Sequence, residues 1–122
     1  MTKKLIGKYL FGGRFIELYT TDEWGADFTF ASEGQRLPSI CIGFSGASWE
    51  DIVKRLLHEM FEFAYSEMNC RYNASHDYGN DHGGYIFVYN HVQLSDACGR
   101  VAQLMAVCLP DLAKAWAKRS KK

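Results

Sequence analysis

The feature that most constrains the fold is a run of apolar residues at helical spacing between Ser48 and Asn69. Apolar side chains every three or four residues form one wide stripe on an α-helix. In this run they are Trp49, Ile52, Val53, Leu56, Leu57, Met60, Phe61, Ala64 and Met68. Ser48 is placed to cap the first turn, and Asp51 follows at the spacing of a weak capping box. The sequence therefore predicts one long amphipathic helix over about 48–69.

The rest of the chain predicts several strands and a second helix. Runs with strand composition lie at 3–11, 14–20, 26–31, 39–44 and 85–89. Gly12-Gly13 separates the first two runs and is typical of a hairpin turn. A second apolar stripe covers about 93–119, where Pro110 should kink the helix. We therefore predict an α+β fold, in which an antiparallel meander of about four to five strands is packed on one face by the two long helices.

The length and composition indicate one ordinary globular domain. The chain has 122 residues, of which 48% are hydrophobic and 23% charged, so residues 1–122 are predicted to form a single domain. No apolar run is long enough to cross a bilayer, and the basic start of the chain has no apolar signal-peptide core behind it. The four cysteines include no Cys-x-x-Cys pair, and Cys98 and Cys108 fall on the apolar stripe of the second helix. We expect a cytoplasmic protein with reduced thiols in its core.

The net charge is zero, but the charges are unevenly distributed. Eight basic residues lie near the two ends: Lys3, Lys4, Lys8, Lys114, Lys118, Arg119, Lys121 and Lys122. Residues 9–113 hold all 14 acidic residues against six basic ones, a net charge of −8. An acidic body does not suit a surface for duplex nucleic acid, so we expect no nucleic-acid partner. Because no apolar run is long enough to cross a bilayer, we expect no membrane partner either. The chain also lacks the glycine-rich loops that bind nucleotide phosphates.

One short motif suggests metal chemistry. The residues Leu57-His58-Glu59-Met60-Phe61-Glu62-Phe63-Ala64 resemble the active-site helix of zincin peptidases, in which two histidines at i and i+4 bind Zn²⁺ and a glutamate polarises water. The resemblance implies His58 and Glu62 as zinc ligands and Glu59 as the catalytic base. Glu62 departs from the family pattern, because it occupies the position of the second histidine. A third ligand would have to come from His76, Asp77, Asp81, His82 or His91.

The same helix face has a second interpretation that needs no metal. Pairs of opposite charge at i,i+4 spacing, such as Arg55–Glu59 and His58–Glu62, are common on solvated helix faces. On this interpretation the chain has no catalytic residue and no cofactor.

Residues 70–91 have the composition of a protein-binding surface. They are rich in Tyr, Asn, Ser, Gly, His and Asp, and rigid aromatic groups mixed with small polar ones are typical of binding loops. The predicted partner-binding residues are Tyr72, Asn73, His76, Asp77, Tyr78, Asn80, Asp81 and His82, together with Trp24 from another loop. The alternative is a loop whose tyrosines half-bury over the edge of the sheet.

The chain as a whole resembles small single-domain proteins encoded in bacteriophage and prophage genomes. The resemblance rests on Leu56–Ala64, Asn69–Tyr72, the strand Tyr85-Ile-Phe-Val, and Cys108-Leu109-Pro110-Asp111-Leu112. It implies a protein that acts by binding a host protein, as phage anti-defence proteins do. The leading hypothesis is a non-enzymatic protein-binding domain that contacts its partner through residues 70–91 and the acidic body. The alternative is a zinc-dependent hydrolase or peptidase of the zincin type.

Overall fold

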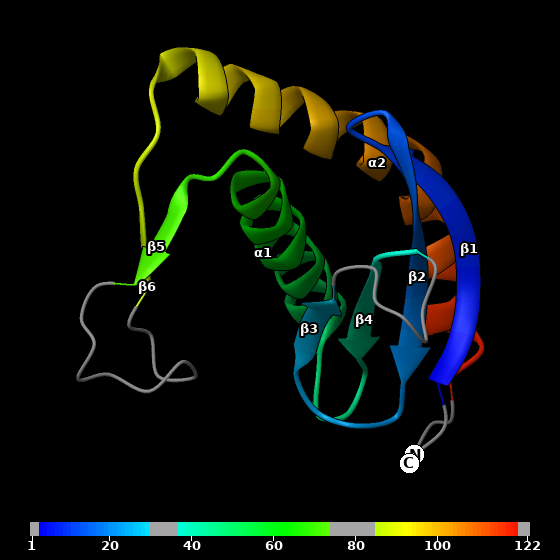
Figure 1. Ribbon diagram of the computed structural model, residues 1–122. Coiled ribbons are helices and arrows are strands. Elements are labelled where there is room, and N and C mark those ends of the chain that lie inside the picture. Colours follow the sequence, from blue (N-terminus) through cyan, green and yellow to red (C-terminus); the bar gives the residue numbers. More distant parts are fainter. Residues whose placement is uncertain (1–2, 30–36, 74–84, 120–122) are drawn as a thin grey trace.

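The computed structural model describes residues 3–29, 37–73 and 85–119, and it has two helices and six strands there (Figure 1). In chain order they are β1 (Lys3–Phe11), β2 (Arg14–Thr21), β3 (Ala26–Thr29), β4 (Ser39–Gly43), α1 (Trp49–Glu67), β5 (Arg71–Asn73), β6 (Tyr85–Phe87) and α2 (His91–Ala117). The predicted α+β class and both long helices are confirmed. None of the described helices is both long and apolar enough to span a membrane.

The main sheet has four strands in the order β1-β2-β4-β3. β1 and β2 form the predicted hairpin, and its turn residues Gly12 and Gly13 both have positive φ. β4 lies between β2 and β3, parallel to β2 and antiparallel to β3. The predicted all-antiparallel meander is therefore wrong, and the sheet is mixed. Every residue of β4 is buried, and a central position gives such a strand partners on both edges.

The predicted fifth strand does not join the main sheet. Within the run 85–89, only Tyr85–Phe87 is a strand, and it pairs antiparallel with β5 in a separate sheet of two strands. β5 lies in the stretch that the sequence predicted to be a loop. β5 is only three residues long, too short to stand out in the sequence, and its pairing depends on β6 from further along the chain.

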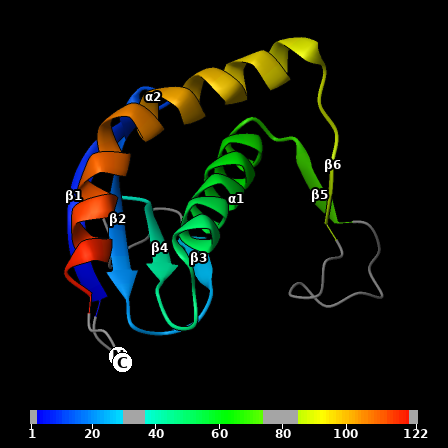
Figure 2. The same ribbon diagram turned by 180° about the vertical axis from the view of Figure 1, so that it is seen from behind.

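Both helices begin with a complete capping box. Ser48 and Asp51 form the one predicted for α1, and Asn90 with Gln93 forms another at α2. The buried face of α1 is rotated from the predicted stripe, because Phe63 is fully buried and Leu57 and Phe61 are only partly buried. α2 continues through Pro110 as one helix, and Figures 1 and 2 show it curving over the sheet.

The core lies between the sheet and the two helices, which pack on the same face as predicted (Figure 2). α1 covers β3 and β4, whereas α2 covers β1. Phe63 of α1 packs edge-on against Phe11 and Phe28, with ring centroids 5.6 and 5.5 Å away. All four cysteines are free; Cys41, Cys70 and Cys108 are buried, but Cys98 is exposed, contrary to the expectation for its stripe.

Candidate functional site

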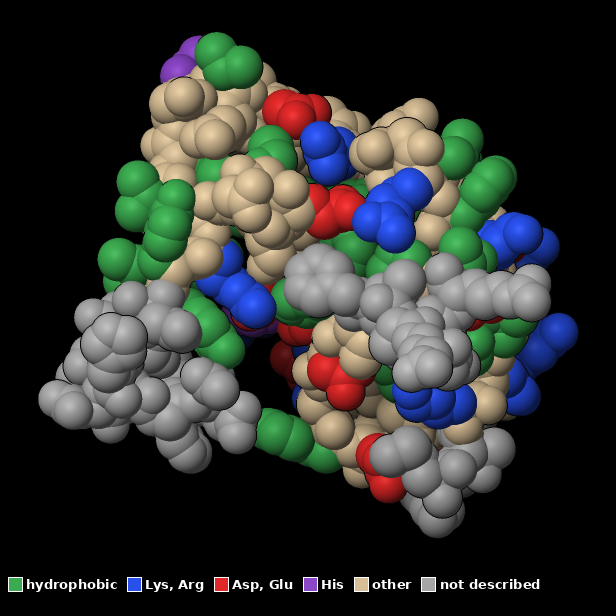
Figure 3. All heavy atoms as spheres, viewed as in Figure 1, with side chains coloured by type: hydrophobic (Ala, Val, Ile, Leu, Met, Phe, Trp, Pro, Cys, Tyr) green, Lys and Arg blue, Asp and Glu red, His purple; other side chains and the backbone are tan. Residues whose placement is uncertain are grey.

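The small β5–β6 sheet and the first turns of α2 extend away from the main sheet (Figures 1 and 2). The first residue of α2 that is fully buried is Ala97, so the turn and a half before it has little support from the body. We call this projecting surface the arm. Its exposed apolar residues are Tyr72, Ile86, Phe87, Val88, Tyr89, Val92 and Leu94. Figure 3 shows hydrophobic side chains gathered along this edge of the molecule.

The arm is held to the body by backbone bonds and stacked rings. The Val88 N–H donates to the Cys70 carbonyl at 2.8 Å, and the Cys70 N–H donates to the Tyr65 carbonyl at 2.8 Å. The Tyr89 ring stacks on the ring of Tyr65, with centroids 4.6 Å apart and planes 14° apart. One side of the arm is therefore fixed to α1, while the other side leaves its apolar groups in solvent.

Of the predicted partner-binding residues, those that the structure describes lie in two different places. Tyr72 is exposed on the arm, and Asn73 is the last residue of β5. His76, Asp77, Tyr78, Asn80, Asp81 and His82 lie outside the described residues. Trp24 is 81% exposed, but it lies in the β2–β3 loop, where its ring is 5.9 Å from the guanidinium of Arg55 on α1. The structure thus gives Trp24 a different neighbourhood from that of Tyr72.

The prediction missed most of the arm surface. It concentrated on the polar part of residues 70–91 and left out Ile86, Phe87, Val88, Val92 and Leu94. A signal was present in the sequence, because no Asp, Glu, Lys or Arg occurs from residue 85 to residue 95. An uncharged stretch usually indicates burial in the core, so exposure could not be inferred from it.

A second candidate site lies on α1. His58 Nε2 is 3.1 Å from Glu62 Oε2 and 3.8 Å from Glu59 Oε2. One donor atom from each of these three residues lies within 4.8 Å of the other two, a grouping that could hold a metal ion. Among the described residues this grouping has no fourth member, and His91 is not part of it. The other predicted third ligands lie outside the described residues.

Glu59 is not on a solvated face, which corrects the i,i+4 interpretation. The residue is only 7% exposed, and burial raises the pKa of its carboxyl from 4.5 to about 7. The nearby His58 lowers this pKa, whereas Glu62 and Asp27 raise it further. The predicted partner Arg55 turns elsewhere and donates to the Gly43 carbonyl at 2.6 Å. A carboxyl that titrates near neutrality suits general acid–base chemistry.

Two features define the surroundings of this carboxyl. A pocket of about 410 Å³ lies between α1 and the β2–β3 loop, and Trp24, Arg55, His58 and Glu59 are among its lining residues. On the other side, Arg71 of β5 donates to Glu62 Oε1 at 3.1 Å and lies over the Tyr85 ring at 4.4 Å. The guanidinium therefore competes with any metal ion for Glu62, and it ties the cluster to the arm.

Comparisons of the chain with protein-family models, with curated proteins and with solved structures found no match.

Proposed function

We propose that this protein is a non-enzymatic binding domain that uses the arm to contact another protein. The observation that carries the proposal is the exposed, uncharged run of residues 85–95 on a projecting hairpin and helix start. Contiguous exposed apolar surface is costly in water and marks binding sites. The centres of protein interfaces are likewise enriched in aromatic groups and depleted of charge.

The partner that fits this surface is a folded protein with an apolar, uncharged patch. The arm offers two tyrosines and a phenylalanine, which supply contact area at low entropic cost because they have few rotatable bonds. The cysteines are free, which accords with action in the cytoplasm, and we propose a host protein as the partner. Inhibition or modulation of a host defence protein is the form of action that we propose, because the sequence resembles phage-encoded proteins.

The test compares two valine substitutions on one helix. Val92 is 74% exposed on the arm, whereas Val107 is 51% exposed on α2 outside the arm. Wild type, Val92→Ser and Val107→Ser are immobilised and exposed to a bacterial host lysate, and retained proteins are purified and titrated. We expect binding that Val92→Ser weakens by about tenfold or more and Val107→Ser leaves unchanged.

Two outcomes would contradict this proposal. One is a retained protein that binds wild type and Val92→Ser equally well. The other is a wild-type protein whose mass in light scattering doubles with concentration and whose arm is covered by a second copy, since the arm would then be a self-association surface.

A second candidate function is zinc-dependent hydrolysis, favoured by the grouping of His58, Glu59 and Glu62. His58 and Glu62 would hold the ion, and Glu59 would take the proton of a bound water. Arg71 weakens this candidate because its guanidinium already binds Glu62. Titration calorimetry of untagged protein with zinc decides the matter. Stoichiometric binding that His58→Ala abolishes and His91→Ala retains would support it, and no heat above background would reject it.

A further inference from the structure

The two basic ends of the sequence come together in the structure. The start of β1 and the end of α2 lie side by side in both ribbon views (Figures 1 and 2). Between them is a pocket of about 570 Å³, a volume typical of small-molecule sites. Its basic lining residues are Lys4 from β1 and Lys114, Lys118 and Arg119 from α2 and the residues that follow it.

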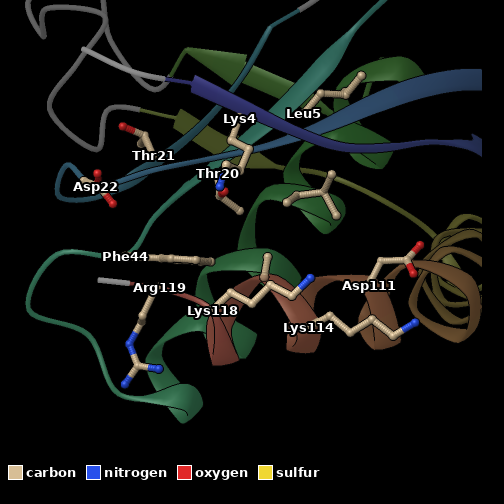
Figure 4. A pocket seen from close by; sticks show the side chains of 12 residues that line it. Lys4, Leu5, Thr20, Thr21, Asp22, Phe44, Asp111, Lys114, Lys118 and Arg119 are labelled. Carbon is tan, nitrogen blue, oxygen red and sulfur yellow. The ribbon is translucent and has the colours of Figure 1, made fainter. Parts of the chain in front are cut away.

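No carboxylate in the described part of the chain forms an ion pair with the lysines of this pocket. Across the described ranges, Arg14, Arg71 and Arg100 all form ion pairs, whereas Lys4, Lys114 and Lys118 form none. Arg119 is used differently: it donates to the Trp116 carbonyl at 2.7 Å and lies over the Trp116 ring at 3.4 Å. In Figure 4 its guanidinium points away from the space between β1 and α2. Figure 4 shows the Lys114 side chain running along α2, with its ammonium on the side of Asp111 and away from Lys4. Lys4 from β1 and Lys118 after α2 are therefore the ammonium groups on the two sides of the space between β1 and α2.

The remaining walls offer hydroxyl, carboxylate and apolar groups. Thr20 is buried at the base of the pocket, and Phe44 supplies an aromatic wall fixed by its edge-on contact with Trp116 at 5.2 Å. The carboxylates are Asp22 and Asp111, and Asp111 accepts a hydrogen bond of 2.6 Å from the Tyr9 hydroxyl. The carboxylates oppose a purely anionic ligand but accept hydrogen bonds from hydroxyl groups.

We propose that this pocket binds a small phosphate ester with a hydroxyl-bearing body, such as a sugar phosphate. The phosphate lies between the ammonium groups of Lys4 and Lys118, which form charge-assisted hydrogen bonds to its oxygens. Lys114 adds positive charge at the Asp111 end of the pocket. Hydroxyl groups of the ligand donate to Asp22 and Asp111, and its carbon skeleton packs on Phe44. This site is at the other side of the fold from the arm and is independent of the proposed function.

The test is a titration of the full chain with ribose 5-phosphate, ribose and inorganic phosphate, followed by amide chemical shifts and calorimetry. We expect ribose 5-phosphate to bind more tightly than inorganic phosphate, and ribose not to bind. The shifts should centre on Thr20, Thr21 and Lys118. Lys4→Gln and Lys118→Gln should each weaken binding about five- to tenfold. Lys8→Gln changes a lysine on the same strand that does not line the pocket, and it should leave the affinity unchanged.

Three results would overturn the proposal. One is the absence of saturable binding by ribose 5-phosphate. The lysines would then only interact favourably with the C-terminal end of α2 and keep the surface soluble. Another is equal weakening by Lys8→Gln and Lys118→Gln, which would indicate diffuse attraction to a basic surface. The third is binding only to phosphatidylcholine vesicles that contain phosphatidic acid, which would assign the lysines to a membrane surface.

Discussion

Among single residues, Glu59 has the largest expected effect on how the stability of the protein depends on pH. Its carboxyl is almost fully buried, and no described residue donates a hydrogen bond to it. Burial without such a donor disfavours the charged form, which is why its pKa rises to about 7. The folded protein therefore binds a proton here that the unfolded chain releases near pH 4.5.

This proton makes stability depend on pH. Because the folded pKa is the higher one, the contribution of Glu59 is fully present below about pH 4.5 and is lost as the pH rises through about 7. We expect Glu59→Gln to stabilise the protein at pH 8 by about 2–3 kcal/mol and to have little effect at pH 4.5. Urea unfolding at both pH values in chelator-containing buffer measures this. If Glu59→Gln changed the free energy of unfolding equally at both pH values, the charged carboxylate of Glu59 would have to be solvated in the folded protein.

The burial of Glu59 could not be predicted from the sequence. Its spacing from Arg55 favoured an ion pair on a solvated face. The structure instead directs Arg55 to the Gly43 carbonyl and to Trp24, contacts that depend on where the β2–β3 loop lies against α1. His58–Glu62, by contrast, lies within one helix turn, so its predicted pairing is confirmed at 3.1 Å.

At the scale of elements, the junction between β4 and the β2–β3 loop is unusually close. The Gly43 N–H donates to the Gly25 carbonyl at 2.7 Å. A Cβ at Gly43 would lie 2.4 Å from the carbonyl oxygen of Glu23 and 2.6 Å from that of Gly25. Both neighbours are backbone atoms, so neither can move without displacing the loop.

Alanine substitutions at two glycines should therefore have opposite effects. We expect Gly43→Ala to destabilise the protein by about 1–3 kcal/mol, because the loop must shift to admit the methyl group. Gly99 lies in α2, where an added Cβ meets nothing within 4 Å. Gly99→Ala should stabilise the protein by about 0.5–1 kcal/mol through helix propensity. Thermal unfolding of both variants is the measurement, and a stable Gly43→Ala protein would disprove the close packing.

The elements themselves were more predictable than their pairing. Capping chemistry and apolar periodicity are local, so both helices and the β1–β2 hairpin could be predicted. The insertion of β4 between β2 and β3 is non-local, because nothing in residues 39–43 identifies their neighbours. The pocket between β1 and α2 could not be predicted either, since its lysines come from residues more than a hundred positions apart.

At the scale of the whole molecule, one hydrogen bond joins the first strand to the last helix. Tyr9 donates to Asp111 across 102 residues of sequence, and burial is the main cause that raises the pKa of the Tyr9 hydroxyl. We expect Tyr9→Phe to destabilise the protein by about 1–2 kcal/mol, because Asp111 loses a donor in a partly buried place. Tyr19→Phe removes a bond that reaches only two residues, to Glu17, and should have a smaller effect. If both variants lost the same free energy of unfolding in denaturant, the Tyr9–Asp111 bond would contribute no more to stability than the local Tyr19–Glu17 bond.

The packing of α2 on β1 also bears on how the chain folds during its synthesis. β1 is made before α2, and the helix that covers its inner face is completed about a hundred residues later. At ribosomal rates of roughly 5–20 residues per second, Tyr9, which donates to Asp111 of α2, waits about 5–20 s for that cover. We therefore expect the β1–β2 hairpin to form early and to stay exposed to other nascent chains until α2 is made. Its aggregation during expression should depend on how fast the ribosome reaches α2.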